Sequence, residues 1–313
     1  MNNSALTEKE FNTAISVIKK LIWADRGQRE TLQALGLNVI PANFYSNIPS
    51  ISEIQSSYEY TDSAVPYLNE AIFDKDFLRK ELLELVPFAE DFRPSENGDE
   101  ENCERFFWKN SQFSYSDAMS YYAYIRRIKP QAVVEIGSGF SSLIALEALK
   151  KNGRGKLTCI EPFPRPFITS LGNTDSIDLH KICAQDVTPE MLNSTLSDGD
   201  ILFIDSTHTV KTGSDCLHIY LRLLPHIRKK ISVHIHDIFL PFGLPQNWLL
   251  DTQIYWTEQY LLLAWMIDNP RVSVLFGSAY HDYFNPEILD TLMHGRFPRG
   301  GGSFWLEYDG RRD

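Results

Sequence analysis

Short apolar segments rich in β-branched residues alternate with helical segments through most of this chain. The strand candidates are residues 132–136, 156–161, 179–184, 200–205, 231–236, 272–277 and 302–308. Helical patterns fill most of the intervals between them, and a helix at 114–130, with Ser116 or Asp117 placed to cap it, precedes the first strand. Strands that alternate with helices form βαβ units, whose strands lie parallel in one sheet. The sequence therefore predicts a three-layer α/β sandwich around a mostly parallel seven-stranded sheet.

The first third of the chain has a different, helical pattern. Thr7 and Glu10 fit a capping box, which marks the start of a helix. A polar and acidic stretch at 93–105 is the best linker candidate. We therefore expect a helical N-terminal extension over residues 1–109 and an α/β domain over residues 110–313.

Charge and cysteine content exclude several classes of protein. The net charge is −11 and the pI is about 5.2, so a nucleic acid is not expected as a partner, because phosphate binding needs clustered basic side chains. None of the four cysteines forms a C-x-x-C pair, and Cys159 and Cys183 lie in predicted strands. We expect buried free thiols, a cytoplasmic location, no secretory signal and no membrane span. The sequence does not indicate the oligomeric state.

Polar residues, most of them acidic, follow each of the first five strand candidates. Ligands of open parallel sheets bind beyond the carboxyl ends of the strands, so these residues are expected to share one site. The candidate site residues are Glu135, Gly137, Ser138, Gly139, Ser141, Glu161, Asp186, Asp205, His208, His236 and Asp237.

The loop after the first strand favours one kind of nucleotide cofactor. A pyrophosphate fingerprint places a third glycine where this chain has Ser142, so that match is incomplete. Glu135, two residues before Gly137, is compatible with a cofactor that has a cationic end. Asp205 directly follows a buried apolar run and needs a partner or ligand to offset its desolvation. His234, in mid-strand, is predicted to be a core histidine.

The segments "VVEIGSGFSS", "LTCIEP" and "DILFIDSTH" together resemble a class I S-adenosylmethionine-dependent methyltransferase over residues 110–313. The resemblance implies a Rossmann-like sheet with an antiparallel last strand and S-adenosylmethionine as cofactor. It implies that Gly137 and Gly139 let the backbone pass under the methionine part of the cofactor and that Glu135 lies near its amino end. Glu161 would bind the ribose hydroxyls, Asp186 would lie by the adenine, and Ser138, Ser141 and Asp205 would complete the cofactor site.

"FIDSTH" and "HIHD" also resemble the metal-dependent O-methyltransferases of this class. In that group an acid after strand four and a pair after strand five hold a divalent ion. Asp205 and Asp237 fit that pattern, while His236 stands where an oxygen ligand is usual. Magnesium prefers oxygen ligands, whereas imidazole suits transition metals. Either the ion of Asp205, His236 and Asp237 is not magnesium, or His236 is a base, or no metal binds.

Methyl transfer to a hydroxyl requires in-line placement of the two reactants and removal of a proton. His208 is the first candidate for the base, with Asp205 beside it, and His236 is the second. Aromatic residues after strand five, including Phe242, Trp248 and Trp256, are candidates for an acceptor pocket wall. We expect the acceptor to be a sugar or another small metabolite.

Three alternatives remain open at this stage. The histidines and aspartates also supply enough ligands for a metal-dependent oxygenase or hydrolase, which leaves the glycine loop and Glu161 unexplained. A non-catalytic nucleotide-type binding module is the second alternative. A nicotinamide oxidoreductase is the third, and Ser142 counts against it.

Overall fold

The computed structural model describes residues 6–174 and 176–311, which form two compact units, Met1–Ser57 and Tyr58–Asp313. The first unit contains α1 (Glu8–Leu21), α2 (Arg26–Ala34) and α3 (Ile51–Ser56). The predicted capping box is confirmed, because Thr7 accepts a hydrogen bond from the Glu10 amide and its own amide donates to Glu10. Asp25 and Gln28 form a second capping box, which starts α2 as a separate helix.

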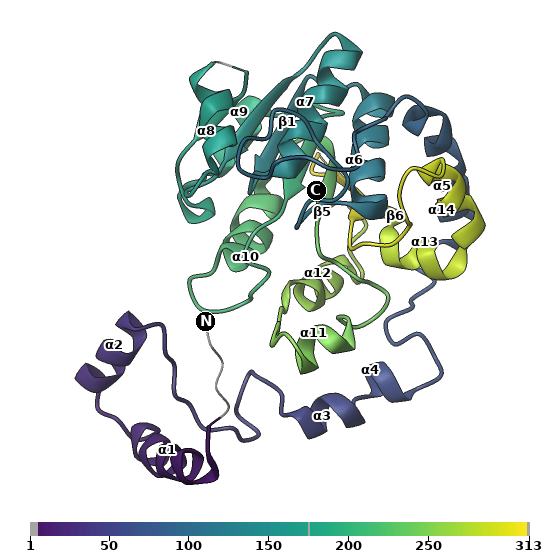
Figure 1. Ribbon diagram of the computed structural model, residues 1–313. Coiled ribbons are helices and arrows are strands. Elements are labelled where there is room, and N and C mark those ends of the chain that lie inside the picture. The colour runs from purple at the N-terminus through teal and green to yellow at the C-terminus, as the bar shows by residue number, and fades with distance from the viewer. Residues whose placement is uncertain (1–5, 175, 312–313) are drawn as a thin grey trace. The chain divides into compact units, whose positions relative to one another are not determined.

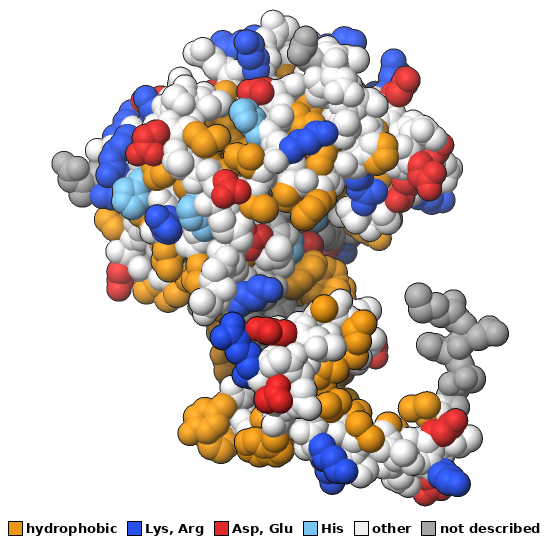
Figure 2. Space-filling view, turned by 90° about the vertical axis from the view of Figure 1, so that its left-hand side faces the viewer, with side chains coloured by type: hydrophobic (Ala, Val, Ile, Leu, Met, Phe, Trp, Pro, Cys, Tyr) orange, Lys and Arg blue, Asp and Glu red, His pale blue; other side chains and the backbone are white. Residues whose placement is uncertain are grey.

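Many apolar side chains of the first unit are exposed. Neither α1 nor α2, as described, contains a buried side chain. Phe11, Ile18 and Trp23 are exposed, Trp23 at 84%. Figure 2 shows hydrophobic side chains over the surface of this part, in the lower half of the view.

The second unit is built around one sheet (Figure 1). Within the described residues it has seven strands in the order β3-β2-β1-β4-β5-β7-β6. The strands are β1 (Ala132–Ile136), β2 (Lys156–Ile160), β3 (Asp178–His180), β4 (Ile201–Ile204), β5 (Lys230–Ile235), β6 (Val272–Gly277) and β7 (Phe304–Asp309). The first five are parallel, and β7 is antiparallel to both β5 and β6. The predicted fold class is confirmed.

Helices lie on both faces of the sheet (Figure 1). The longer ones are α5 (Lys75–Ala89), α6 (Tyr115–Ile128), α7 (Phe140–Asn152), α8 (Pro166–Asn173), α12 (Glu258–Met266) and α14 (Pro286–Met293). The shorter ones are α4 (Tyr58–Thr61), η1 (Ala184–Asp186), α9 (Pro189–Thr195), α10 (Asp215–His218), η2 (Ile219–Leu223), η3 (Leu224–His226), α11 (Gln246–Leu250) and α13 (Ser278–Phe284). No described helix has the length and apolar character needed to cross a membrane.

The side chains of β1 alternate between two hydrophobic cores. Val133 packs in the core that contains α6 and α7, while Val134 and Ile136 pack in the core on the opposite face. Because successive side chains of a strand point to opposite faces, Glu135 shares the α6–α7 face with Val133. This parity directs the Glu135 side chain into the protein rather than toward the end of the strand.

Several sequence expectations differ from the structure. The third strand ends at His180 rather than continuing to residue 184, and Cys183 is exposed rather than buried. Ser116 and Asp117 do not cap α6, because the helix begins at Tyr115 and both side chains are buried.

The two compact units meet in sequence at Ser57 and Tyr58. The larger unit begins at Tyr58 and includes α5, whose Leu82 and Leu85 pack in the same core as α6. A functional division at residues 109 and 110 stays a prediction.

Candidate active site

The glycine loop joins β1 to α7 and touches the loop that follows β4. Gly137 has a φ of +90°, and a Cβ atom placed on it would lie 1.9 Å from the carbonyl oxygen of Asp205. Both the conformation and the close approach require glycine at this position. Gly139 differs, since its φ is 176° and no heavy atom lies within 4 Å of an added Cβ. The loop therefore packs against the backbone of Asp205 at Gly137, whereas Gly139 borders open space.

Glu135 lies inside the protein, next to the glycine loop. Its side chain is fully buried and accepts hydrogen bonds from the Tyr121 hydroxyl (2.9 Å) and the Ser142 hydroxyl. Ser142 in turn accepts a bond from the Gly139 amide at 3.2 Å. Burial raises the pKa of Glu135 to about 7, against the hydrogen bonds that lower it. Glu135 therefore supports the glycine loop through Ser142, and its place near the amino end of a cofactor stays a prediction.

The other predicted cofactor residues lie at the same sheet edge in different surroundings. Glu161 follows β2 and accepts a hydrogen bond from the Ser138 amide at 3.3 Å, so it touches the glycine loop directly. The Ser138 hydroxyl is buried without a hydrogen-bond partner among the described residues, and Ser141 is buried. Asp186, in η1, is exposed. An unpartnered hydroxyl and an open loop fit a polar cofactor, and these residues stay proposed cofactor contacts.

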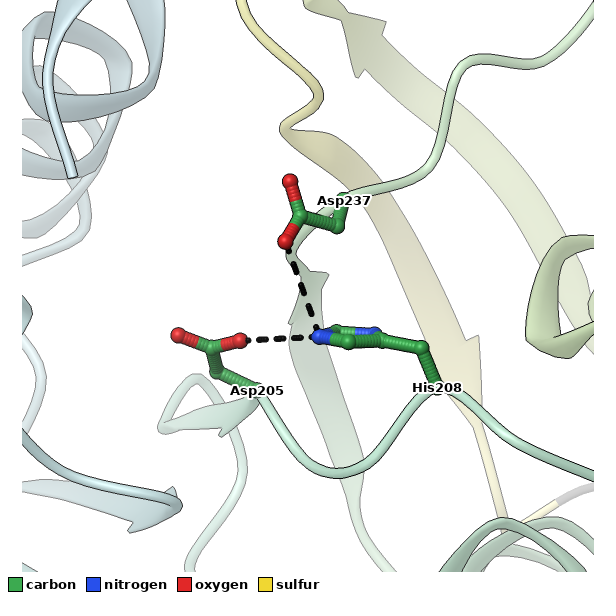
Figure 3. Close-up of side chains that lie close together, drawn as sticks. All are labelled: Asp205, His208 and Asp237. Carbon is green, nitrogen blue, oxygen red and sulfur yellow. Dashed lines mark ion pairs between the residues drawn. The ribbon is translucent and has the colours of Figure 1, made fainter. Parts of the chain in front are cut away.

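Two aspartates and a histidine converge beyond β4 and β5 (Figure 3). Nε2 of His208 lies 3.2 Å from Asp205 Oδ1 and 3.6 Å from Asp237 Oδ2. One ligand atom from each of the three residues lies within 4.8 Å of the others. His208 and Asp237 both have a φ of +56°, a left-handed conformation that costs non-glycine residues about 1–3 kcal/mol. The surrounding structure therefore holds both residues in a conformation that costs free energy.

His208 is held in place by residues at the start of α12. Its Nδ1 lies 2.8 Å from Oε2 of Glu258, which is 1% exposed. Its carbonyl oxygen accepts hydrogen bonds from the amides of Thr257 (2.8 Å) and Glu258 (3.1 Å). The ring of Trp256 lies against the imidazole with centroids 4.4 Å apart. The ring therefore has a fixed orientation, with Nε2 directed at the aspartates.

His236 approaches the same aspartates from β5. Its Nδ1 lies 3.5 Å from Asp205 Oδ1 and 3.6 Å from Asp237 Oδ2. Its Nε2 lies 3.2 Å from Oδ2 of Asp117, which sequence reasoning had assigned to a helix cap. His234, two residues earlier and on the same face of the strand, is fully buried, lies 2.7 Å from the Ser303 hydroxyl and stacks on Trp305. The prediction of a core histidine at position 234 is confirmed.

The cluster favours the charged forms of Asp205, His208 and His236. Burial opposes ionisation of Asp205, but attraction to His236 and hydrogen bonding to His208 hold its pKa well below the usual range. Burial also opposes a charge on His208, but its bonds to Asp205 and Glu258 raise its pKa to about 10. The pKa of His236 lies well above its ordinary value because Asp237 and Asp205 outweigh burial, which also raises the pKa of Asp237. Without a bound cation the carboxylates therefore favour protonated imidazoles, and a cation held by the carboxylates would take the place of those protons.

A cavity of about 750 Å³ opens onto this cluster. Its size is within the usual range for small-molecule sites. Trp248 and Trp256 line it as predicted, together with Phe239. Phe242 does not line it and packs against Tyr283 instead. The residues of the wall also include Asn110, Gln112, Phe113, Asp117, Gly300, Gly301 and Gly302.

The donor set fits a divalent cation. Carboxylate oxygens of Asp205 and Asp237 face nitrogens of His208 and His236 at 3.2–3.6 Å. The compact group of three contains His208, while the sequence had named His236. Mixed nitrogen and oxygen ligands suit zinc, iron, manganese or cobalt better than magnesium.

Asp117 and Glu258 are the residues of this site that sequence reasoning missed. Asp117 lies on α6 and contacts His236, which is 119 positions away in the sequence. Glu258 lies on α12 and contacts His208, which is 50 positions away. One signal was present for Asp117. The segment from Ser116 to Ile125 is buried throughout, and a charged residue in such a helix needs a partner.

Comparisons with known proteins agree with this geometry. A family described as a methyltransferase domain matches residues 134–238, which span β1 to the end of β5 and contain the glycine loop, Asp205, His208 and Asp237. An uncharacterized protein of Archaeoglobus fulgidus is 34% identical over 166 residues, which cover 50% of this chain and 72% of that protein.

Solved structures show weaker similarity. The O-methyltransferase TomG from Streptomyces achromogenes, crystallised with S-adenosylmethionine, has a TM-score of 0.39 and 16% identity, covering 62% of this chain and 79% of its own. An O-methyltransferase from Bacillus cereus in complex with S-adenosylhomocysteine has a TM-score of 0.39 and 12% identity, covering 76% and 95%. These similarities are remote.

Proposed function

Because this chain belongs to the class I S-adenosylmethionine-dependent methyltransferases, we propose that it methylates a hydroxyl oxygen of a sugar or another small metabolite. The observation that carries the proposal is the meeting of two loops. The glycine loop at Gly137 lies against the backbone of Asp205, and Asp205 faces His208 inside the cavity. A methyl donor over the first loop and an acceptor in the cavity are therefore neighbours, as in-line transfer requires.

The proposed donor site consists of the glycine loop and the residues around it. Gly137 and Gly139 provide the close backbone approach, and Ser138, Ser141 and Glu161 provide polar groups. Asp186 and Asp205 lie at the same sheet edge. Glu135 acts through Ser142 by holding the loop.

The proposed base is His208. Its Nδ1–H donates to Glu258, which leaves Nε2 directed into the cavity. A carboxylate behind the imidazole fixes its orientation and favours the charged form that arises when it takes a proton. Asp205 and Asp237 must be engaged by another cation before Nε2 is free to accept the proton of the acceptor hydroxyl.

Asp205 and Asp237, together with His236, are the proposed ligands of a divalent metal ion. Such an ion supplies positive charge that lowers the pKa of a hydroxyl bound beside it. Trp248, Trp256 and Phe239 provide flat apolar faces in the cavity, which suit the C–H face of a sugar or an aromatic ring. The acidic chain, with its net charge of −11, disfavours a nucleic acid as the acceptor. A cytoplasmic location stays a prediction.

Calorimetry with S-adenosylhomocysteine tests the donor site directly. We expect binding to the folded protein with one site per chain. Absence of binding would overturn the proposal, and metal binding without it would favour the oxygenase or hydrolase alternative. A screen for S-adenosylhomocysteine release over panels of sugars and phenols would then identify acceptors.

A further inference from the structure

Asp117 occupies a position that a helix cap does not explain. Its carboxylate is 4% exposed and accepts hydrogen bonds from the amides of Gly302 (2.9 Å) and Ser303 (2.7 Å) and from the Ser278 hydroxyl (2.7 Å). Its remaining contact is Nε2 of His236 at 3.2 Å. A carboxylate surrounded by donors acts only as an acceptor, so the hydrogen of His236 lies on Nε2.

The backbone next to Asp117 has a conformation that makes room for its carboxylate. Gly301 has a φ of +103°, and a Cβ atom there would lie 2.3 Å from Asp117 Oδ2. Glycine at this position allows the segment before β7 to wrap around the carboxylate and present its amides. The same segment lines the cavity, so α6, β5 and the start of β7 are joined at Asp117.

With Nε2 engaged, Nδ1 of His236 is directed at the two aspartates. His236 is 4% exposed, and Nδ1 has no hydrogen-bond partner among the described residues. It lies 3.5 Å from Asp205 Oδ1 and 3.6 Å from Asp237 Oδ2. A buried nitrogen without a partner is costly unless a ligand engages it.

These separations are too long for hydrogen bonds, which span about 2.7–3.2 Å. They match the spacing of atoms that share a metal ion. Ligands bound at about 2.1 Å and at the tetrahedral angle are roughly 3.4 Å apart. The geometry therefore favours an ion between Nδ1 and the two carboxylates.

We infer that Asp117 is a positioning residue that holds His236 with Nδ1 as a metal ligand, and that the centre consequently prefers nitrogen-binding transition metal ions to magnesium. The inference rests on the proposed function in one respect, which is that the metal site is taken to be the site of methyl transfer. Metal binding is measured without any acceptor or methyl donor.

The test is metal binding to the full chain after removal of bound ions with a chelator. Calorimetry with Zn²⁺, Co²⁺ and Mg²⁺, together with the visible absorption of the Co²⁺ form, reports affinity and nitrogen ligation. We expect Zn²⁺ and Co²⁺ to bind at least about a thousandfold more tightly than Mg²⁺. Asp117→Asn should weaken Co²⁺ binding about 10–100-fold and alter its spectrum.

Ser278→Ala is the matched control, because it removes a hydrogen bond to the same carboxylate and leaves the contact with His236 in place. Its Co²⁺ affinity should stay near that of the unmodified chain. His236→Ala should abolish the preference for Co²⁺ over Mg²⁺, and it decides the question if Asp117→Asn does not fold.

Equal losses in Asp117→Asn and Ser278→Ala would overturn the inference, because they would indicate a purely structural role. Equal affinity for Mg²⁺ and Co²⁺ would also overturn it, as would loss of binding in His208→Ala with His236→Ala unaffected. Calorimetry with S-adenosylhomocysteine on the same samples separates the two proposals, since donor binding without metal preference contradicts this inference alone.

Discussion

Glu258 and His208 are joined by a 2.8 Å hydrogen bond between two side chains that are almost completely buried. The bond links the loop after β4 to the first turn of α12. The other carboxylate oxygen of Glu258 accepts a bond from the Tyr220 hydroxyl at 2.9 Å. The orientation of the proposed base is therefore set by a residue outside the segment that contains it.

Glu258→Gln should lower kcat for methyl transfer about 10–100-fold, because the imidazole loses the charge that fixes its orientation. The affinity for S-adenosylhomocysteine should not change. Tyr220→Phe removes a hydrogen bond from the same carboxylate without touching His208, and it should retain most of the activity. Kinetics with an acceptor found in the screen provide the measurement. Similar losses in both variants would argue that Glu258 has only a packing role.

His208→Ala should abolish turnover while the affinity for S-adenosylhomocysteine stays near that of the unmodified chain. The substitution removes Nε2, the atom directed at the acceptor cavity, and leaves the glycine loop intact. Single-turnover methyl transfer and calorimetry measure the two quantities separately. Unchanged turnover would refute the assignment of His208 as the base.

Gly137→Ala and Gly139→Ala form a matched pair in the glycine loop. An alanine at 137 has a strained φ and a Cβ 1.9 Å from the Asp205 carbonyl oxygen, whereas one at 139 meets nothing within 4 Å. We expect Gly137→Ala to lower the free energy of unfolding by about 2–4 kcal/mol. Gly139→Ala should fold normally and lose affinity for S-adenosylhomocysteine, because the added methyl enters the space proposed for the cofactor. Urea denaturation and calorimetry check both, and a Gly139→Ala variant with full affinity would place the cofactor elsewhere.

Stability should depend on pH through Glu135. The pKa of this buried carboxyl is raised from 4.5 to about 7, with burial as the largest cause. The folded chain keeps the proton where the unfolded chain loses it. The stabilisation is therefore complete below pH 4.5 and is lost as the pH rises to about 7. Across this pH range the free energy of unfolding should fall by roughly 3 kcal/mol, because each unit of pKa shift corresponds to about 1.4 kcal/mol.

Glu135→Gln cannot lose a proton and should lack this dependence. The difference in unfolding free energy between the two proteins, measured in urea at pH 5 and pH 8, should change by about 2.5 kcal/mol in favour of the variant at pH 8. Titrations of other groups cancel in the difference. An equal difference at both pH values would show that Glu135 stays ionised in the folded protein.

The strands and the sheet edge that carries the proposed site could be predicted from the sequence because both follow from local patterns. Apolar runs gave the strands, and parallel strands place their carboxyl ends together. The third strand was overextended because Ile182, Cys183 and Ala184 continue the apolar pattern after the last paired residue, His180.

The roles of Asp117 and Glu258 could not be predicted because each depends on a contact between distant segments. An acid near the start of a helix is commonly a cap or a solvated side chain, and local sequence favours that interpretation. Only the packing of α6 and α12 against the sheet edge brings these carboxylates behind His236 and His208. The exact partner of a buried charge is a property of the tertiary structure.

The position of β7 between β5 and β6 has a consequence for the order in which the chain folds during synthesis. Both neighbours leave the ribosome before β7 does, so each has an unpaired edge until residues 304–309 emerge. The segment that wraps around Asp117 emerges just ahead of β7, at residues 300–303. The sheet and the cavity at its edge are thus completed by the same late stretch of polypeptide.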